Sequence, residues 1–185
     1  MARFPKAYAE RVQRLRVPVG FVLLGCFAWL AHPSPESILA SLPVILVGLA
    51  TRAWAAGHLE KNLTLAESGP YAYTRNPLYL GTFAVALGFA VAAGNWILAL
   101  IFVVAFLLIY VPVMEREEEH LLGIFAAYKD YAARVPLLWP RFGAQGSKRF
   151  QLALYVKNEE YKASLGAWTA LLLLGVKVYF KDEVG

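Results

Sequence analysis

The sequence predicts an all-α, polytopic membrane helical bundle of about five transmembrane helices, formed as a single domain over residues 1–185. Hydrophobic residues make up 59% of the chain, and its mean hydropathy is +0.50. Only 17% of the residues are charged, whereas a soluble domain usually carries about 25%. The charged residues also gather in blocks between apolar segments, as they do in integral membrane proteins.

Five apolar segments account for the predicted spans. They cover residues 17–31, 38–56, 78–94, 96–114 and 163–179. A spanning helix needs about 20 residues, so the first segment must borrow flanking residues, and a signal peptide is its alternative reading. Against a signal peptide, the region before it is long and no Ala-x-Ala site follows. Gly94 and Asn95 form a turn signal, which predicts that the third and fourth segments make an antiparallel hairpin.

The remaining organisation follows from these spans. N-terminal helices occupy residues 1–60, the hairpin and its polar flanks occupy 61–142, and a surface helix with the last span occupies 143–185. Within the last part, residues 149–162 look amphipathic, which predicts a helix on the membrane surface.

Basic residues predict the orientation of the chain. Lysine and arginine lie before the first span, between the second and third, and between the fourth and fifth, but not in residues 32–37 or 94–95. The positive-inside rule therefore places the N-terminus, residues 69–81 and residues 115–162 in the cytoplasm, as expected for a bacterial-type inner membrane. This explains the net charge of +5 without a nucleic-acid partner. The first basic group is Arg3, Lys6, Arg11, Arg14 and Arg16.

The first polar cluster, residues 69–81, reads Gly-Pro-Tyr-Ala-Tyr-Thr-Arg-Asn-Pro-Leu-Tyr-Leu-Gly. Pro77 disfavours helix at Asn76, so the third span should begin near Pro77 with free backbone N–H groups. Those groups and the guanidinium of Arg75 could bind a carboxylate or phosphate. Tyr79 and Gly81 follow, and the glycine allows a ligand or a helix to approach closely. The alternative is an interfacial aromatic belt with an anchoring arginine.

The second polar cluster, residues 115–120, follows the fourth span directly. If the helix continues, Glu115 and Glu118 share one face, and Glu117 and His120 share another. Such carboxylates suit a cation such as an amine or a sulfonium, and the alternative is a solvated face partnered by Arg116. We expect no metal, because His120 is the one nitrogen ligand in the cluster, and the lone Cys26 has no ligand companion.

Tyr128 and Tyr131, spaced i,i+3, add an aromatic face that suits a positively charged ligand, although interfacial aromatics are the alternative. The sequence contains no nucleophile elbow, Walker loop, GxGxxG, HExxH or paired CxxC. Tyrosine, glutamate and arginine without an activated nucleophile favour a reaction in which the protein binds and orients a reactive cofactor.

The two-part pattern resembles the isoprenylcysteine carboxyl methyltransferase family and, more broadly, the phospholipid N-methyltransferases. The resemblance covers about residues 48–140 and implies S-adenosylmethionine as the cofactor. Two departures are that many members have histidine where Asn76 stands, and that the spacing after Phe125 is one residue shorter. The implied cofactor-binding residues are Tyr73, Arg75, Asn76, Pro77, Tyr79, Gly81, Glu117, Glu118, His120, Tyr128 and Tyr131.

The expected function is methyl transfer from S-adenosylmethionine to a lipophilic or prenylated acceptor within the bilayer. For a carboxylate acceptor no base is needed, and Arg75 or Arg134 would orient it. For an amine, Glu117, Glu118 or His120 would remove a proton. The alternatives are a non-catalytic membrane interaction protein and a nicotinamide-dependent membrane reductase. A transporter is disfavoured because the spans hold almost no ionisable residues, with Arg52 as the main exception.

Overall fold

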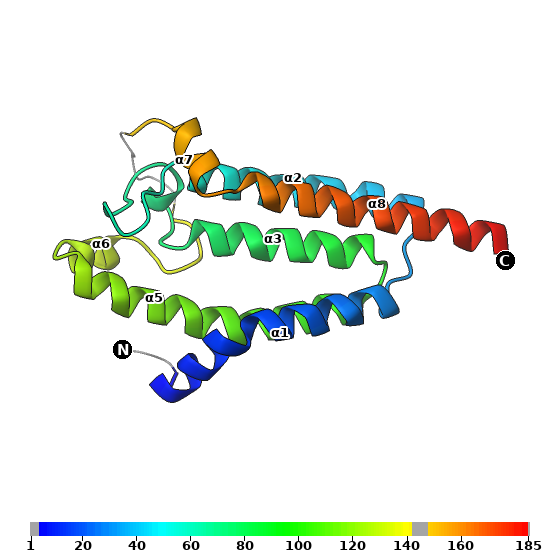
Figure 1. Ribbon diagram of the computed structural model, residues 1–185, viewed down its shortest axis with the longest axis horizontal. Coiled ribbons are helices and arrows are strands. Elements are labelled where there is room, and N and C mark those ends of the chain that lie inside the picture. The colour runs from blue at the N-terminus through cyan, green and yellow to red at the C-terminus, as the bar shows by residue number, and fades with distance from the viewer. Residues whose placement is uncertain (1–3, 142–147, 185) are drawn as a thin grey trace.

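The computed structural model describes residues 4–141 and 148–184, and this part of the chain is helical with no strand. Five long helical rods lie side by side, and the shorter helices cluster at one end (Figure 1). The long rods are α1 (Lys6–Leu30), α2 (Pro35–Ala56), α3 (Pro77–Ala92), the continuous helix α4 (Trp96–Ala105), η2 (Phe106–Tyr110) and α5 (Val111–Ile124), and α8 (Tyr161–Val184). The short helices are η1 (Gly69–Ala72), α6 (Tyr128–Arg134) and α7 (Leu152–Lys157). The predicted all-α membrane bundle is confirmed.

The lengths of the rods refine the predicted number of spans. Within the described residues, three helices are long and apolar enough to cross a membrane: 35–56, 96–124 and 161–180. α1 adds a fourth if its two halves count as one span; they meet at an angle of 55° beside Pro18, which cannot donate a helical hydrogen bond. α3 has 16 residues and is about 24 Å long, shorter than the ~30 Å hydrocarbon core.

α3 occupies the centre of the bundle. α2 and α8 lie on one side of it, and the α4–η2–α5 helix with α1 lies on the other (Figure 1). The predicted hairpin turn is confirmed: Gly94 has φ +62°, and the side chain of Asn95 accepts a hydrogen bond from the backbone of Ile97 at 2.9 Å. From this turn α3 and α5 diverge, so their far ends are separated by a wedge-shaped interval (Figure 1).

Glycines bring α2 and α3 into close contact. A Cβ atom built on Gly48 would lie 2.8 Å from the carbonyl oxygen of Gly81, and one built on Gly88 would lie 2.5 Å from Ile45 Cγ1. Small residues at such crossings let two helix backbones approach within a membrane, where packing rather than water exclusion holds helices together. This contact fixes α3 against α2, and therefore fixes the position at which α3 begins.

The helix that carries the second polar cluster is longer than predicted. It extends the segment 96–114 without interruption to Ile124, through a π-helical turn at Phe106–Tyr110. The hydroxyl of Tyr8 donates to the carbonyl of Leu108 in this turn at 2.8 Å, which ties α1 to the turn. Because the helix continues, residues 115–120 are held on a rigid element, as the sequence suggested.

The predicted surface helix over residues 149–162 is not continuous. α7 covers six residues, and the chain then turns through Glu159, which has φ +55°, before α8 begins. The physical reason is the end of α2, whose last carbonyls need donors. The side chain of Asn158 donates to the carbonyl of Ala56, the last residue of α2, at 3.0 Å and to that of Leu59, in the turn that follows, at 2.9 Å. Two earlier expectations lie outside the described residues: the charge at Arg3 and the boundary at 142/143.

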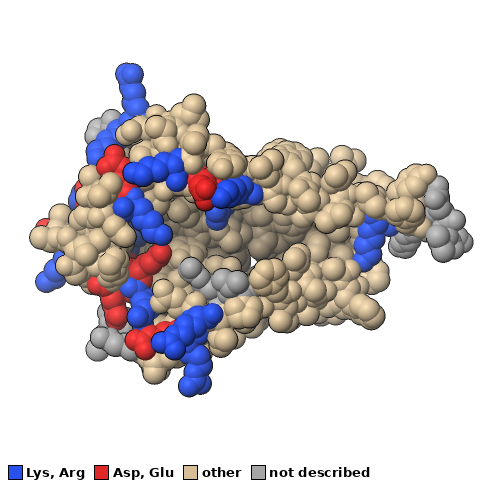
Figure 2. Space-filling view, viewed as in Figure 1, with Lys and Arg blue, Asp and Glu red and all other residues tan. Residues whose placement is uncertain are grey.

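Charged side chains gather at the end of the molecule where α6 and α7 lie, while the long middle part is almost free of them on the face shown (Figure 2). The N-terminal end of α1, the start of α3 and the end of α5 also lie at this end (Figure 1). The two predicted polar clusters therefore share one end of the bundle, as the sequence predicted.

Candidate functional site

The two polar clusters meet where the start of α3 lies across from the last turns of α5. Arg75, just before α3, forms an ion pair with Glu118 of α5, and both side chains are largely shielded from water, with 15% and 20% exposed. The hydroxyl of Tyr128, at the start of α6, donates to the same Glu118 carboxylate at 3.0 Å. Three of the predicted site residues, from three separate elements, therefore converge.

The backbone before α3 is held by the segment that follows α6. The amide of Arg75 donates to the carbonyl of Pro136 at 2.9 Å, and the carboxamide of Asn76 donates to the carbonyl of Leu137 at 3.1 Å. The hydroxyl of Thr74 donates to the same Leu137 oxygen at 3.3 Å. Asn76 therefore has a structural task, which is to fix the chain just before Pro77, where α3 begins.

Tyr128 and Tyr131 are both buried, and their rings pack edge to face with centroids 5.8 Å apart. Each hydroxyl has a defined acceptor, since Tyr131 donates to the carbonyl of Tyr71 at 2.8 Å. Their predicted common face thus packs into the protein, against Leu65, Leu121 and neighbouring apolar residues, and fastens α6 to η1 and α5. The i,i+3 spacing was a correct sign of a shared face.

Burial raises the pKa of Tyr128, and the negative charge of Glu118 raises it further. Burial likewise raises the pKa of Tyr131 and of Tyr71. A raised pKa means that the folded protein favours the neutral hydroxyl. The contribution of these hydroxyls to the free energy of unfolding is complete below the ordinary tyrosine pKa of about 10. It is lost as the pH rises through their higher pKa in the folded protein. These hydroxyls therefore remain donors throughout the physiological pH range.

Replacing Tyr128 with phenylalanine tests this inference by ultraviolet titration of tyrosinate. In the folded protein the replacement should leave the ionisation between about pH 9 and 11 unchanged, because Tyr128 does not ionise there. In denaturant the same variant should show one ionising tyrosine fewer. Loss of an ionisation from the folded protein in that range would contradict the assignment.

The site retains unused hydrogen-bond donors. The Nε atom of Arg75 is buried and has no partner among the described residues. The first turn of α3 has no side-chain cap on its N–H groups. An orphaned buried donor carries a free-energy cost, which an acceptor such as a carboxylate would remove. These donors fit the amino-acid carboxylate of a bound ligand such as S-adenosylmethionine.

The other residues of the second cluster have different surroundings. Glu117, Glu119 and His120 are exposed at the same end of α5. Glu115 accepts a hydrogen bond from the amide of Phe4 at 3.3 Å. Arg116 pairs with Glu10 of α1 at 3.0 Å, rather than neutralising its own carboxylate cluster. Of the neighbouring carboxylates on α5, the half-buried Glu118 therefore faces Arg75, while Glu117 and Glu119 are exposed at the rim.

Aromatic pairs bridge α3 and the π-helical turn, nearer to the hairpin turn than the ion pair is. The rings of Tyr79 and Tyr110 lie 5.8 Å apart, and those of Phe83 and Phe106 lie 4.6 Å apart. Tyr79 was predicted, whereas the other three were not. They occur on the two facing helices of the predicted hairpin, but their shared side depends on the π-helical turn, which the sequence did not reveal.

Several predicted residues do not converge on the Arg75–Glu118 pair. The side chain of Arg134 is 68% exposed, and its nearest acidic partner is Glu67 at 3.9 Å. Gly81 packs against Gly48 and Arg52 of α2, so the close approach it permits is that of a helix. The ring of Tyr73 lies 6.2 Å from that of Trp54 on α2.

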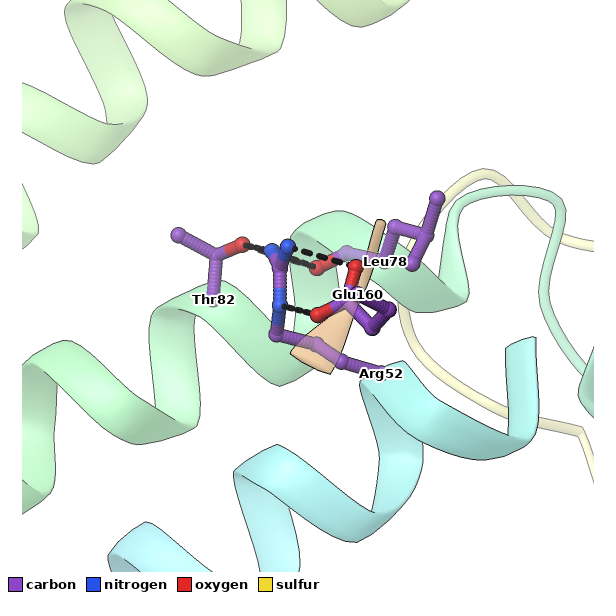
Figure 3. A network of polar contacts seen from close by, with 4 residues as sticks. All are labelled: Arg52, Leu78, Thr82 and Glu160. Carbon is purple, nitrogen blue, oxygen red and sulfur yellow. Dashed lines mark hydrogen bonds and ion pairs between the residues drawn. The ribbon is translucent and has the colours of Figure 1, made fainter. Parts of the chain in front are cut away.

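One polar network was not anticipated as a network. Arg52 of α2 contacts Glu160, Thr82 and the carbonyl of Leu78 (Figure 3). The sequence contained one sign of this network, which is a lone arginine inside an apolar span. Such an arginine needs an acidic or polar partner. Nothing in the sequence singled out Glu160 as that partner. In the described part of the chain, no group of three or more His, Cys, Asp or Glu side chains could hold a metal ion.

Comparison with known proteins places this sequence in a family. A family model described as phospholipid methyltransferase matches residues 47–128, which contain both polar clusters. The nickel-cobalt-cadmium resistance protein NccN of Alcaligenes xylosoxydans xylosoxydans is 33% identical over 169 residues, covering 86% of this chain and 73% of NccN. The chain belongs to the phospholipid methyltransferase family. The predicted resemblance to this family is thereby confirmed, and the isoprenylcysteine methyltransferase relative described next supports the other part of it.

Two further relatives match over shorter parts. The cobalt-zinc-cadmium resistance protein CzcN of Cupriavidus metallidurans is 34% identical over 108 residues, 56% of this chain and 50% of its own length. The protein-S-isoprenylcysteine O-methyltransferase of Schizosaccharomyces pombe is 29% identical over 147 residues, 71% of this chain and 58% of its own. The chain thus spans about half to three quarters of these relatives. No solved structure matches it.

Proposed function

We propose that this protein transfers a methyl group from S-adenosylmethionine to a lipophilic acceptor in the membrane. The observation that carries the proposal is the convergence of Arg75, Glu118 and Tyr128, with the Nε donor of Arg75 left unused. Membership of the phospholipid methyltransferase family and the isoprenylcysteine methyltransferase relative support the reaction class.

The residues take separate roles in this proposal. Arg75 and the first-turn amides of α3 bind the carboxylate of the ligand. Glu118, held by Tyr128, orients Arg75, while Glu117 at the rim adds negative charge that favours a cation. When bound, S-adenosylmethionine supplies an electrophilic methyl group on a positively charged sulfur. The protein accelerates the transfer by positioning the acceptor and by excluding water.

The acceptor reaches the site from the bilayer side. The aromatic pairs Tyr79–Tyr110 and Phe83–Phe106 form an apolar surface between the Arg75–Glu118 pair and the hairpin turn, and such a surface suits a lipophilic group. A carboxylate acceptor needs no base, so O-methylation requires only orientation by arginine. For an amine acceptor, the exposed Glu117 or His120 would accept the proton, because Glu118 is engaged with Arg75. We place this site at the cytosolic face of a bacterial-type inner membrane.

Isothermal titration calorimetry of the detergent-solubilised protein tests the proposal. S-adenosylmethionine should bind at one site, and adenosine alone should bind more weakly, because it lacks the carboxylate that Arg75 receives. NADPH should not bind, which separates this function from a membrane reductase. Folded protein that shows no heat with S-adenosylmethionine would refute the proposal. Incorporation of labelled methyl into the lipid-extractable fraction would then identify the acceptor class.

A further inference from the structure

An ion pair between Arg52, inside the matched family region, and Glu160, beyond it, connects the C-terminal segment to α3. The guanidinium of Arg52 donates two hydrogen bonds to the carboxylate of Glu160, from Nε to Oε1 at 2.5 Å and from Nη2 to Oε2 at 3.0 Å. Its Nη1 atom donates to the hydroxyl of Thr82 at 2.5 Å and to the carbonyl of Leu78 at 3.4 Å. One side chain of α2 thus joins the turn before α8 to the first turns of α3 (Figure 3).

Both side chains of the Arg52–Glu160 pair are largely shielded from solvent, unlike those of a typical surface ion pair. The side chain of Glu160 is 9% exposed and that of Arg52 is 23% exposed, so neither charge is well solvated. A carboxylate shielded to this degree depends strongly on its partner. Gly81 contributes by its lack of a side chain, because a Cβ there would lie 2.6 Å from Arg52 Cγ. Arg52 can therefore lie flat across α3.

The hydrogen bonds from Arg52 to α3 involve two residues one helical turn apart, Leu78 and Thr82. The hydroxyl of Thr82 accepts from Arg52 and donates to the carbonyl of Leu78 at 2.9 Å. Leu78 follows Arg75, Asn76 and Pro77 directly, so this network acts on the turn that presents the free N–H groups of α3.

We propose that Arg52 and Glu160 are a positioning pair, which locks the first turn of α3 and makes the C-terminal segment 148–184 part of the frame of the binding site. The family model ends at residue 128, so this segment lies beyond the matched region. Further contacts dock it on the end of α2, where the amide of Gln151 donates to the carbonyl of Gly57 at 2.9 Å. If the ion pair only anchored α8 to α2, its contacts would end at Arg52 and Glu160. Arg52 also contacts Thr82 and Leu78 of α3, so the ion pair acts on the start of α3 as well.

Two variants separate positioning from anchoring. Glu160→Gln keeps the size of the side chain but removes its charge. Thr82→Val removes the hydroxyl that links Arg52 to α3, while leaving the ion pair and the longer contact to the Leu78 carbonyl in place. The matched control is Glu159→Gln, because Glu159 is exposed and pairs only with Lys162 among the described residues. Amide hydrogen exchange over residues 74–82 and over 150–165, and the affinity for S-adenosylmethionine, are measured for each variant.

We expect Glu160→Gln to accelerate exchange in both regions and to weaken binding of S-adenosylmethionine about tenfold, the usual scale of coupling between sites. Thr82→Val should accelerate exchange in 74–82 alone and weaken binding in the same direction, while Glu159→Gln changes neither. Unchanged exchange in 74–82 for both Glu160→Gln and Thr82→Val would overturn the proposal, as would unchanged affinity.

The affinity measurement rests on the proposed function, whereas the exchange measurement does not. If the unaltered protein binds no S-adenosylmethionine, the proposed function fails and the exchange result alone decides whether the pair holds α3. If Glu160→Gln does not fold, Thr82→Val decides, since it leaves both charges paired.

Discussion

Replacing Glu118 with glutamine is expected to raise the dissociation constant for S-adenosylmethionine about 100-fold. Removing one partner of a shielded, hydrogen-bonded charge pair costs about 2–5 kcal/mol. Arg75 would lose its ionic partner, and Tyr128 would lose the carboxylate that accepts its hydrogen bond at 3.0 Å. The guanidinium would then no longer be held in the orientation that presents its Nε atom. Isothermal titration in detergent measures the change directly.

The matched control for this experiment is Glu119→Gln. It makes the same chemical change on the next residue of α5, but Glu119 is exposed. We expect its affinity to change less than about threefold, as is usual for a solvated surface charge. Equal losses for the two variants would show that the overall negative charge of α5 matters and that the Arg75–Glu118 pair does not.

The second large effect is expected at the crossing of α2 and α3. Replacing Gly48 with alanine places a Cβ 2.8 Å from both the Gly81 carbonyl oxygen and the Val85 amide nitrogen, which are backbone atoms and cannot move aside alone. Overpacking of this kind costs about 1–3 kcal/mol, which for a chain of this size lowers the melting temperature by about 3–10 °C. Thermal unfolding in detergent, followed by circular dichroism, measures the shift.

Gly166→Ala on α8 is the control for that experiment, because a Cβ on Gly166 meets nothing within 4 Å. There the substitution should be neutral or slightly stabilising, since alanine favours helix over glycine by about 1 kcal/mol. If both variants melt at the temperature of the unaltered protein, the close crossing of α2 and α3 is not a determinant of stability.

The predicted hairpin illustrates what local sequence can specify. Gly94 and Asn95 determine the turn, since one tolerates positive φ and the other caps the following helix. Pro77 likewise predicts where α3 begins. Such features depend on a few adjacent residues, and so they can be read without knowledge of the rest of the fold.

The surface helix predicted over 149–162 illustrates the opposite case. Its amphipathic pattern is real, but the chain breaks at Glu159 so that Asn158 can cap the end of α2. The acceptors that favour this break lie about a hundred positions earlier in the sequence. No pattern within residues 149–162 could have revealed them.

The sequence by itself determined that this is an all-α membrane protein, and that its two polar clusters share one end, because span length and charge segregation are properties of contiguous segments. Only the tertiary structure decided that Glu118, among four neighbouring carboxylates, pairs with Arg75, and that Glu160 pairs with Arg52. These pairings depend on the rotation of each helix about its axis and on the divergence of α3 from α5. Packing across the whole bundle sets both, including the glycine crossing of α2 with α3.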